Sequence, residues 1–314
     1  MEKFGKVIVK LRIPILILSF LLLIPSAIGY FNTRVNYDIL YYLPNEIETM
    51  QGQDILMDDF NKGAYAMVVV QNMDTKSTDR LIKKVENVDH VAQVISYTGI
   101  VGEDVPSEIV PSKFRKYFEN DSTDTTLFAI FFDNTTSSDD TMNAIIQIRE
   151  QTEGQAFISG MSAVVTDTKN LSEKETPLYV LIAVVLVCIV LAIFMDSFLV
   201  PVFFMISIGM AIVYNLGSNI LLGEVSYITK ALAAVLQLGV TLDYSIFLWH
   251  SYKEMKEIYP DDHKEAMAVA IGNTLTSVVG SSITTVAGFI ALCFMSFTLG
   301  LDLGIVMAKG VVFG

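Results

Sequence analysis

The sequence predicts a membrane α-helical bundle, with five complete spans and a truncated sixth, that carries one extracytoplasmic α+β domain. The chain has 314 residues, of which 52% are hydrophobic and only 18% charged, and its mean hydropathy is +0.51. That composition is more apolar than an ordinary soluble domain. The apolar residues gather in runs of about 20, the length that crosses roughly 30 Å of hydrocarbon. One long polar region interrupts these runs.

Five apolar runs are long enough to span a membrane. A sixth begins near Leu303 and stops at Gly314, which is too short for a span, so we expect the chain to be a fragment of a longer protein. The first run follows a basic segment, as in a signal peptide, but its length and Pro25 favour an uncleaved anchor. The five runs cover residues 13 to 30, 177 to 195, 199 to 222, 228 to 249 and 274 to 297.

Basic residues near the first span set the expected orientation. Lys3, Lys6, Lys10 and Arg12 precede this span, so the positive-inside rule places the N-terminus in the cytoplasm. Counting spans forward then makes residues 31–176 extracytoplasmic and makes 250–273 a cytoplasmic segment. We therefore expect three parts: 1–30 with the first span, the domain 31–176, and the helix block 177–314.

The polar region 31–176 alternates strand and helix patterns. Alternating or β-rich runs are "AYAMVVVQN", "HVAQVISYT", "TLFAIFFDN" and "GQAFISG". Helical patterns lie between and beside them, at 49 to 61, 77 to 87, 139 to 152 and 161 to 175. This order predicts a split βαβ, ferredoxin-like domain.

Several classes of function are disfavoured by composition and spacing. The net charge of −13 comes mostly from the polar domain and argues against nucleic-acid binding. His90, His250 and His263 are far apart and make no metal-ligand spacing, while Cys188 and Cys293 lie within expected spans. There is no phosphate loop of the Walker type. We therefore expect no metal, no cofactor and no enzymatic activity.

Asp243 is the residue that most needs an explanation, because it lies in the middle of an apolar run. A charged side chain at bilayer depth costs at least about 2.5–3.5 kcal/mol, and intramembrane acids often mark ion or proton pathways. Gly239 lies one turn before it and would let another helix approach closely, while Tyr244 offers a hydroxyl. We expect Asp243 and Tyr244 to form a proton relay, although a carboxylate that only fixes helix packing is the alternative.

The fifth run carries small hydroxylated residues that could support this relay. Ser281, Thr284 and Thr285 recur at helical spacing, which more often indicates close helix packing than a wet path to Asp243. Lys309 is a cation within the sixth run and could neutralise either Asp243 or Asp302, of which Asp302 is the easier match by spacing.

These features together resemble a known family. One span, a large α+β domain and a helix block that reads "GVTLDYSIFLWHSYKEM" and then "SSITTVAGFIALCF" are similar to the N-terminal half of an MMPL transporter of the RND superfamily. The resemblance covers the whole chain, and its most specific part is Gly239 to Phe247. His250 departs from the pattern, which usually has an arginine nearby.

The resemblance implies export of lipids or amphiphiles across a prokaryotic cell membrane, driven by the proton gradient. Asp243 and Tyr244 would then bond to an equivalent pair in a homologous C-terminal half, in the same polypeptide or a second chain. The outer domain would be a porter domain, and further copies of the chain are another potential partner. The helix block also resembles sterol-sensing domains, so a non-transporting lipid sensor or scaffold remains an alternative, as does a protein-secretion accessory. No residue selects the substrate.

Overall fold

The computed structural model describes residues 2–60, 62–102, 105, 109–120, 122–152, 154–195 and 199–314. The chain divides into two compact units. One consists of Met1–Asn36 with Lys174–Gly314, which we call the helix unit, and the other of Tyr37–Glu173, which we call the sheet unit. The boundary near residue 174 falls inside a helix.

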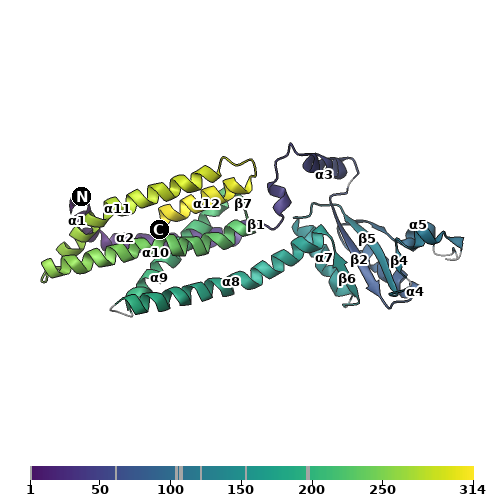
Figure 1. Ribbon diagram of the computed structural model, residues 1–314, viewed down its shortest axis with the longest axis horizontal. Helices are drawn as coiled ribbons and strands as arrows, with labels where there is room; N and C mark the ends of the chain where they lie inside the picture. The colour runs from purple at the N-terminus through teal and green to yellow at the C-terminus, as the bar shows by residue number, and fades with distance from the viewer. Residues whose placement is uncertain are drawn as a thin grey trace. The chain divides into compact units, whose positions relative to one another are not determined.

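Five helices of the described chain are long and apolar enough to cross a membrane, as the sequence predicts: α2, α8, α9, α10 and α11. A short helix, α1, precedes them and α12 follows them (Figure 1). The bounds are α1 Glu2–Lys10, α2 Arg12–Asn32, α8 Met161–Phe194, α9 Leu199–Gly217, η3 Ser218–Leu222, α10 Tyr227–Ile258, α11 His263–Leu292 and α12 Leu299–Phe313.

Two helices are longer than the sequence patterns indicate. The helix expected at 161 to 175 and the span expected from 177 form one helix, α8, which continues through Pro177 although proline removes a helical hydrogen bond. The expected cytoplasmic segment 250–273 is helical except for a short turn, because α10 runs on to Ile258 through residues that favour helix. Asp262 then caps α11 by accepting hydrogen bonds from the backbone N–H groups of Lys264 and Glu265.

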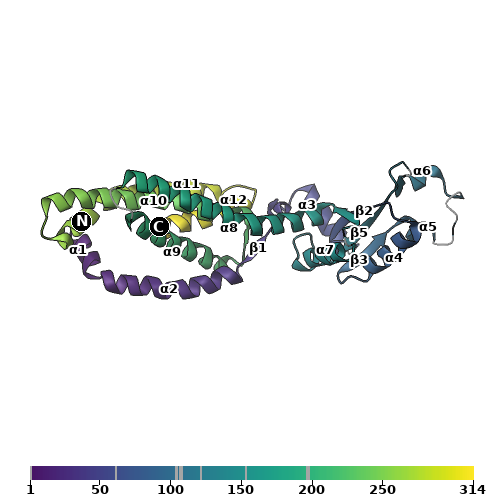
Figure 2. The ribbon, with the colours of Figure 1, turned by 90° about the horizontal axis from the view of Figure 1, so that it is seen from below.

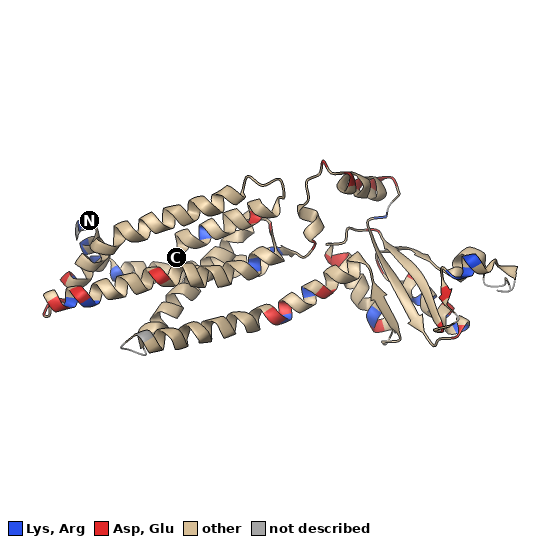
Figure 3. Ribbon diagram, viewed as in Figure 1, with Lys and Arg blue, Asp and Glu red and all other residues tan. Residues whose placement is uncertain are grey.

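The helix unit is held by close helix contacts. Helix α2 packs on α9 where Gly29 and Gly217 meet, and α9, α10 and α12 pack against one another (Figure 2). Their shared core includes Leu216, Ala233 and Val306. Helix α11 contacts α10, α12 and α1. Charged residues are few along the middle of these helices and gather at α1 and around the turn between α10 and α11 (Figure 3).

A two-stranded parallel sheet, which no sequence pattern predicted, lies in the helix unit. Strand β1, Arg34–Asn36, follows α2, and β7, Glu224–Ser226, precedes α10. Its central residue Val225 is buried in the core of the unit. The pairing ties the end of α2 to the start of α10.

The sheet unit contains an antiparallel sheet of order β3-β5-β2-β6, with β4 paired to β5. Helix α4 connects β2 to β3, and α7 connects β5 to β6. Four predicted strand runs are confirmed as β2, β3, β5 and β6. The bounds are η1 Ile39–Tyr42, α3 Glu48–Asp58, β2 Ala64–Gln71, α4 Thr75–Glu86, β3 Val91–Ile95, α5 Tyr97–Val101, α6 Ser112–Arg115, β4 Glu119–Asn120, β5 Thr125–Phe132, α7 Asp139–Thr152 and β6 Ala156–Ser159.

Strict alternation in β2 explains how this sheet packs. Ala66 and Val68 are fully buried beside Ile130 of β5, under α4 and α7, whereas Tyr65 and Met67, which alternate with them, remain exposed. Successive strand residues point to opposite faces. The two helices therefore cover one face of the sheet and leave the other face apolar and open.

Candidate intramembrane site

Asp243 lies on α10, on a face that the described part of the chain does not cover. Its side chain is exposed and has no hydrogen-bond or ion-pair partner among the described residues. Gly239, one turn earlier, is also exposed, and a Cβ added there would meet nothing within 4 Å. The close helix partner that the glycine favours is thus absent from the described chain.

Tyr244 follows Asp243 in sequence but has a different environment. Its hydroxyl is buried and has no hydrogen-bond partner among the described residues. Neighbouring helix residues are rotated by about 100°. The expected relay pair therefore does not share one surface of this unit, and its pairing with a second half stays a prediction.

The supporting residues on α11 are also exposed in part. The hydroxyls of Thr284 and Thr285 both donate to the carbonyl of Ser281, at 2.8 and 2.9 Å, so they are used within their own helix. Gly280 and Gly288 lie on either side of these residues in the sequence, and a Cβ added at either glycine would meet nothing within 4 Å. Gly239 and Asp243 of α10 and Gly280, Ser281 and Gly288 of α11 are all exposed, and we call these uncovered positions of the two helices the open face.

The opposite side of α10 carries buried polar residues that the sequence analysis missed. Gln237 and Thr241 are only 4% and 3% exposed, and Asn215 of α9 is fully buried. The amide of Asn215 donates from Nδ2 to Gln237 Oε1 at 3.1 Å. Gln237, Thr241 and Tyr244 follow at intervals of four and three, which is the signal that could have found this face.

Lys309 of α12 binds the end of α9 and the start of η3 rather than Asp243. Its ammonium donates to Asn219 Oδ1 at 2.6 Å, to Ser218 Oγ at 2.8 Å and to the carbonyl of Asn215 at 3.3 Å. These three acceptors match the three protons of an ammonium group. Lys309 also interacts electrostatically with Asp302, the acid that the spacing favoured.

Asp302 has its own hydrogen-bond partners at the start of α10. Its Oδ2 accepts from the backbone N–H of Ser226 at 2.7 Å and from the hydroxyl of Thr229 at 2.6 Å. A carboxylate is favourable at a helix N-terminus, where backbone N–H groups lack partners. Asp302 therefore joins α12 to α10 and is a structural residue.

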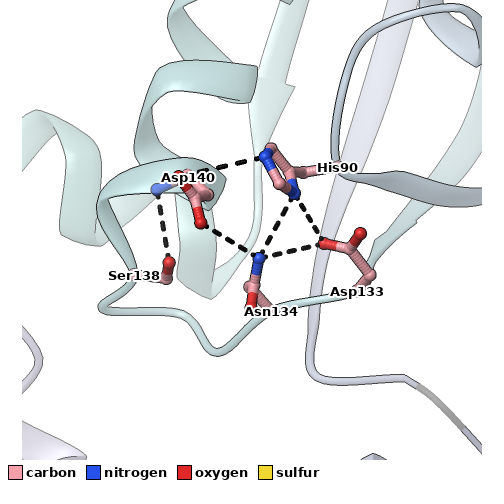
Figure 4. A network of polar contacts seen from close by, with 5 residues as sticks. All are labelled: His90, Asp133, Asn134, Ser138 and Asp140. Carbon is pink, nitrogen blue, oxygen red and sulfur yellow. Dashed lines mark hydrogen bonds and ion pairs between the residues drawn. The ribbon is translucent and has the colours of Figure 1, made fainter.

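A second polar network lies in the sheet unit (Figure 4). Nδ1 of His90 lies 3.2 Å from Asp133 Oδ1, and Asn134 Nδ2 contacts both of these atoms as well as Asp140. His90 and Asp133 are each 40% exposed. No group of histidine, cysteine or acidic residues in the described chain could hold a metal ion. The network joins the end of β5 to α7.

Several apolar helices, with an acid in the middle of one of them, define a multi-pass membrane protein. The model of the MMPL family matches residues 42–314, so the chain belongs to the MMPL family. The family expected from the sequence is thereby confirmed.

Three relatives show how far this similarity extends. A protein of Methanocaldococcus jannaschii, designated membrane protein MJ1562, is 23% identical over 96% of this chain and 87% of its own length. The apo-petrobactin exporter of Bacillus anthracis is 21% identical over 99% of this chain, which spans 42% of the exporter. The membrane protein ActII-3 of Streptomyces coelicolor is 36% identical over 35% of this chain and 16% of its own length.

Proposed function

We propose that this chain is the N-terminal half of a proton-driven exporter of lipids or amphiphiles, in which Asp243 takes up and releases the coupling proton. Membership of the MMPL family and the similarity to an exporter support the transport role. The observation that carries the proposal is the open face, because there Asp243, a carboxylate in the middle of an apolar helix, and Gly239, one turn away, are both left uncovered by the described chain.

The open face has the composition of a helix-packing surface. Glycine and serine allow helix backbones to approach closely in a membrane, and an unpaired carboxylate is costly in lipid. A homologous C-terminal half, in the same polypeptide or a second chain, would supply the covering helices. It would enclose Asp243 in protein, where a second titratable or hydroxyl group could bond to it.

Enclosure of Asp243 gives a physical basis for coupling. Burial in a low dielectric favours the neutral carboxyl group, whereas water or a nearby cation favours the carboxylate. Two packings of the helices would therefore bind a proton unequally. A ligand shifts a conformational equilibrium by its differential affinity for the two states, so proton binding would favour one packing over the other.

The sheet unit would act as an extracytoplasmic porter domain. Its order β3-β5-β2-β6 and its two strand-helix-strand connections agree with a split βαβ, ferredoxin-like fold. The basic residues of α1 support a cytoplasmic N-terminus and hence an outer location for this unit. The exposed apolar side of the sheet suits contact with an amphiphile.

The experiment is proton-driven efflux by the full-length protein in proteoliposomes. Asp243→Asn keeps the shape and the hydrogen-bonding capacity of the side chain but cannot titrate. We expect this variant to insert normally and to lose transport together with substrate-dependent proton flux.

Two comparisons make the result decisive. Asp243→Glu keeps a titratable group and should retain measurable transport, with an altered pH profile. Normal efflux with normal pH dependence in Asp243→Asn would reduce Asp243 to a packing residue. Absence of any proton-dependent efflux in the unaltered protein would instead favour a lipid sensor.

A further inference from the structure

Helix α1 is too short to cross a membrane and does not continue the line of α2. Its nine residues extend roughly 14 Å, about half the thickness of the hydrocarbon core. The chain turns at Leu11, where Figure 2 shows α1 and α2 running in different directions. Because α2 is a candidate span whose apolar run begins just after this turn, we expect α1 to lie near a membrane surface.

Contacts with α11 fix the rotation of α1 about its own axis. A Cβ added at Gly5 would overlap the carbonyl oxygen of Ala268, so the two backbones touch at this point. Lys6, the next residue, forms an ion pair with α11, in which its Nζ lies 2.7 Å from Glu265 Oε1. The sides of α1 away from Gly5 are therefore held in a defined direction.

One of these other sides is apolar and exposed. Phe4 and Val7 are exposed, and so is Leu11 at the turn that follows α1. Intervals of three and four residues place these side chains on one side of a helix. Large apolar side chains are unfavourable in water, so a row of them suits the boundary between lipid headgroups and acyl chains.

A basic side adjoins the apolar side. Lys3, Lys6 and Lys10 also follow at intervals of three and four, and Lys3 is rotated by about 100° from Phe4, the next residue. Lys3 and Lys10 are exposed and have no hydrogen-bond or ion-pair partner among the described residues, whereas Lys6 is paired with Glu265. An apolar side next to a lysine-rich side is typical of a helix that lies in the membrane interface.

We propose that α1 is a binding surface for anionic phospholipids, in which Lys3 and Lys10 bind lipid phosphates while Phe4 and Val7 enter the acyl boundary. Charge complementarity selects this partner, because unpaired ammonium groups attract a negatively charged headgroup more strongly than a zwitterionic one. The apolar row alone would also suit a protein helix. A lipid surface offers apolar depth and negative charge side by side, which matches both sides of α1 at once. The inference uses no residue of the open face and does not depend on transport.

Photo-crosslinking from position 4 tests this surface. The full-length protein with Phe4→p-benzoylphenylalanine is placed in nanodiscs of phosphatidylglycerol and phosphatidylcholine in equal amounts, with the same acyl chains. After irradiation, mass spectrometry of the peptide that contains position 4 measures the ratio of the two lipid adducts. We expect at least about fivefold more phosphatidylglycerol adduct, which is the preference that one lysine near an anionic surface supplies. Adding Lys3→Gln and Lys10→Gln should lower the ratio to less than about twofold, because both free ammonium groups are then lost.

Matched variants exclude indirect effects. Leu186→p-benzoylphenylalanine places the crosslinker on the exposed surface of the apolar run in α8, where the two lipids should react equally. Lys76→Gln with Lys84→Gln removes the same charge from exposed positions of α4, and the lipid preference at position 4 should remain. Equal adducts of both lipids at position 4, or a preference unchanged by loss of Lys3 and Lys10, would overturn the proposal. Adducts between position 4 and protein in place of lipid would also overturn it and would assign this side of α1 to a protein interface.

Discussion

The two sides of α10 carry polar residues in opposite situations. On one side, Gln237 and Thr241 are buried against neighbouring helices, and Gln237 accepts a hydrogen bond from Asn215. On the other side, Asp243 is exposed beside Gly239 and has no partner in the described chain. The first side packs against helices of this chain, whereas the second side is left uncovered by the described residues. One helix thus serves both internal cohesion and the proposed assembly.

Glycines show the same contrast. Gly217 meets the backbone of Ser26 in the contact between α9 and α2, so no side chain could fit there. Gly239, Gly280 and Gly288 have free space around them. Small residues allow close helix approach in both regions. Only the first region uses that capacity within the described residues.

Removing the ammonium group of Lys309 should have the largest effect on stability. Lys309→Met leaves Oδ1 of Asn219, a residue that is only 1% exposed, without its donor, and it also removes the ammonium that donates to the half-buried Ser218 Oγ. Each unsatisfied buried group costs about 1–3 kcal/mol, so we expect a loss of about 3 kcal/mol. Equilibrium unfolding in mixed detergent micelles would measure it. Lys253→Met, near the exposed end of α10, is the control, and an equal loss there would contradict the assignment.

A methyl group should have opposite effects on the free energy of unfolding at a glycine in a close helix contact and at an exposed glycine. Gly217→Ala forces the backbones of α2 and α9 apart and should cost about 1–3 kcal/mol of unfolding free energy. Gly239→Ala should be neutral or stabilise this chain by roughly 0.5–1 kcal/mol, because alanine favours helix. The thermal midpoints of both variants would show this difference.

The Gly239→Ala variant also tests the proposal for the open face. In the full-length protein, Gly239→Ala should reduce transport, because the proposed covering helix would then approach less closely. Unchanged transport by this variant would mean that position 239 is not in a close helix contact.

Tyr244→Phe should have the smallest effect on stability. The hydroxyl is buried without a partner among the described residues, so its removal should change the unfolding free energy by less than about 1 kcal/mol. Transport by the full-length protein should weaken less than in Asp243→Asn. A loss of stability larger than that of Gly217→Ala would show that the hydroxyl is bonded within this chain.

Sequence patterns located the spans and the strands because each depends on local periodicity. Long apolar runs placed five helices, and the alternation in β2 and β5 placed the centre of the sheet. The predicted ends of helices were less accurate, as α8 and α10 show. Both helices continue through polar residues beyond the apolar run, so the end of the apolar run does not mark the end of the helix. The strands β1 and β7 are three residues each and depend on a partner nearly two hundred residues away, which no local pattern reveals.

By itself, the sequence determined that this is a multi-pass membrane protein of the MMPL kind with an acid inside an apolar helix. Hydropathy and a short motif are properties of neighbouring residues, so they can be read along the chain. Only the tertiary structure decided which polar residues meet. It assigned Lys309 to Asn219 and Ser218, paired Asn215 with Gln237, and left Asp243 uncovered. The physical reason is that a helix fixes which side a residue occupies, whereas the packing of separate helices decides what lies opposite it.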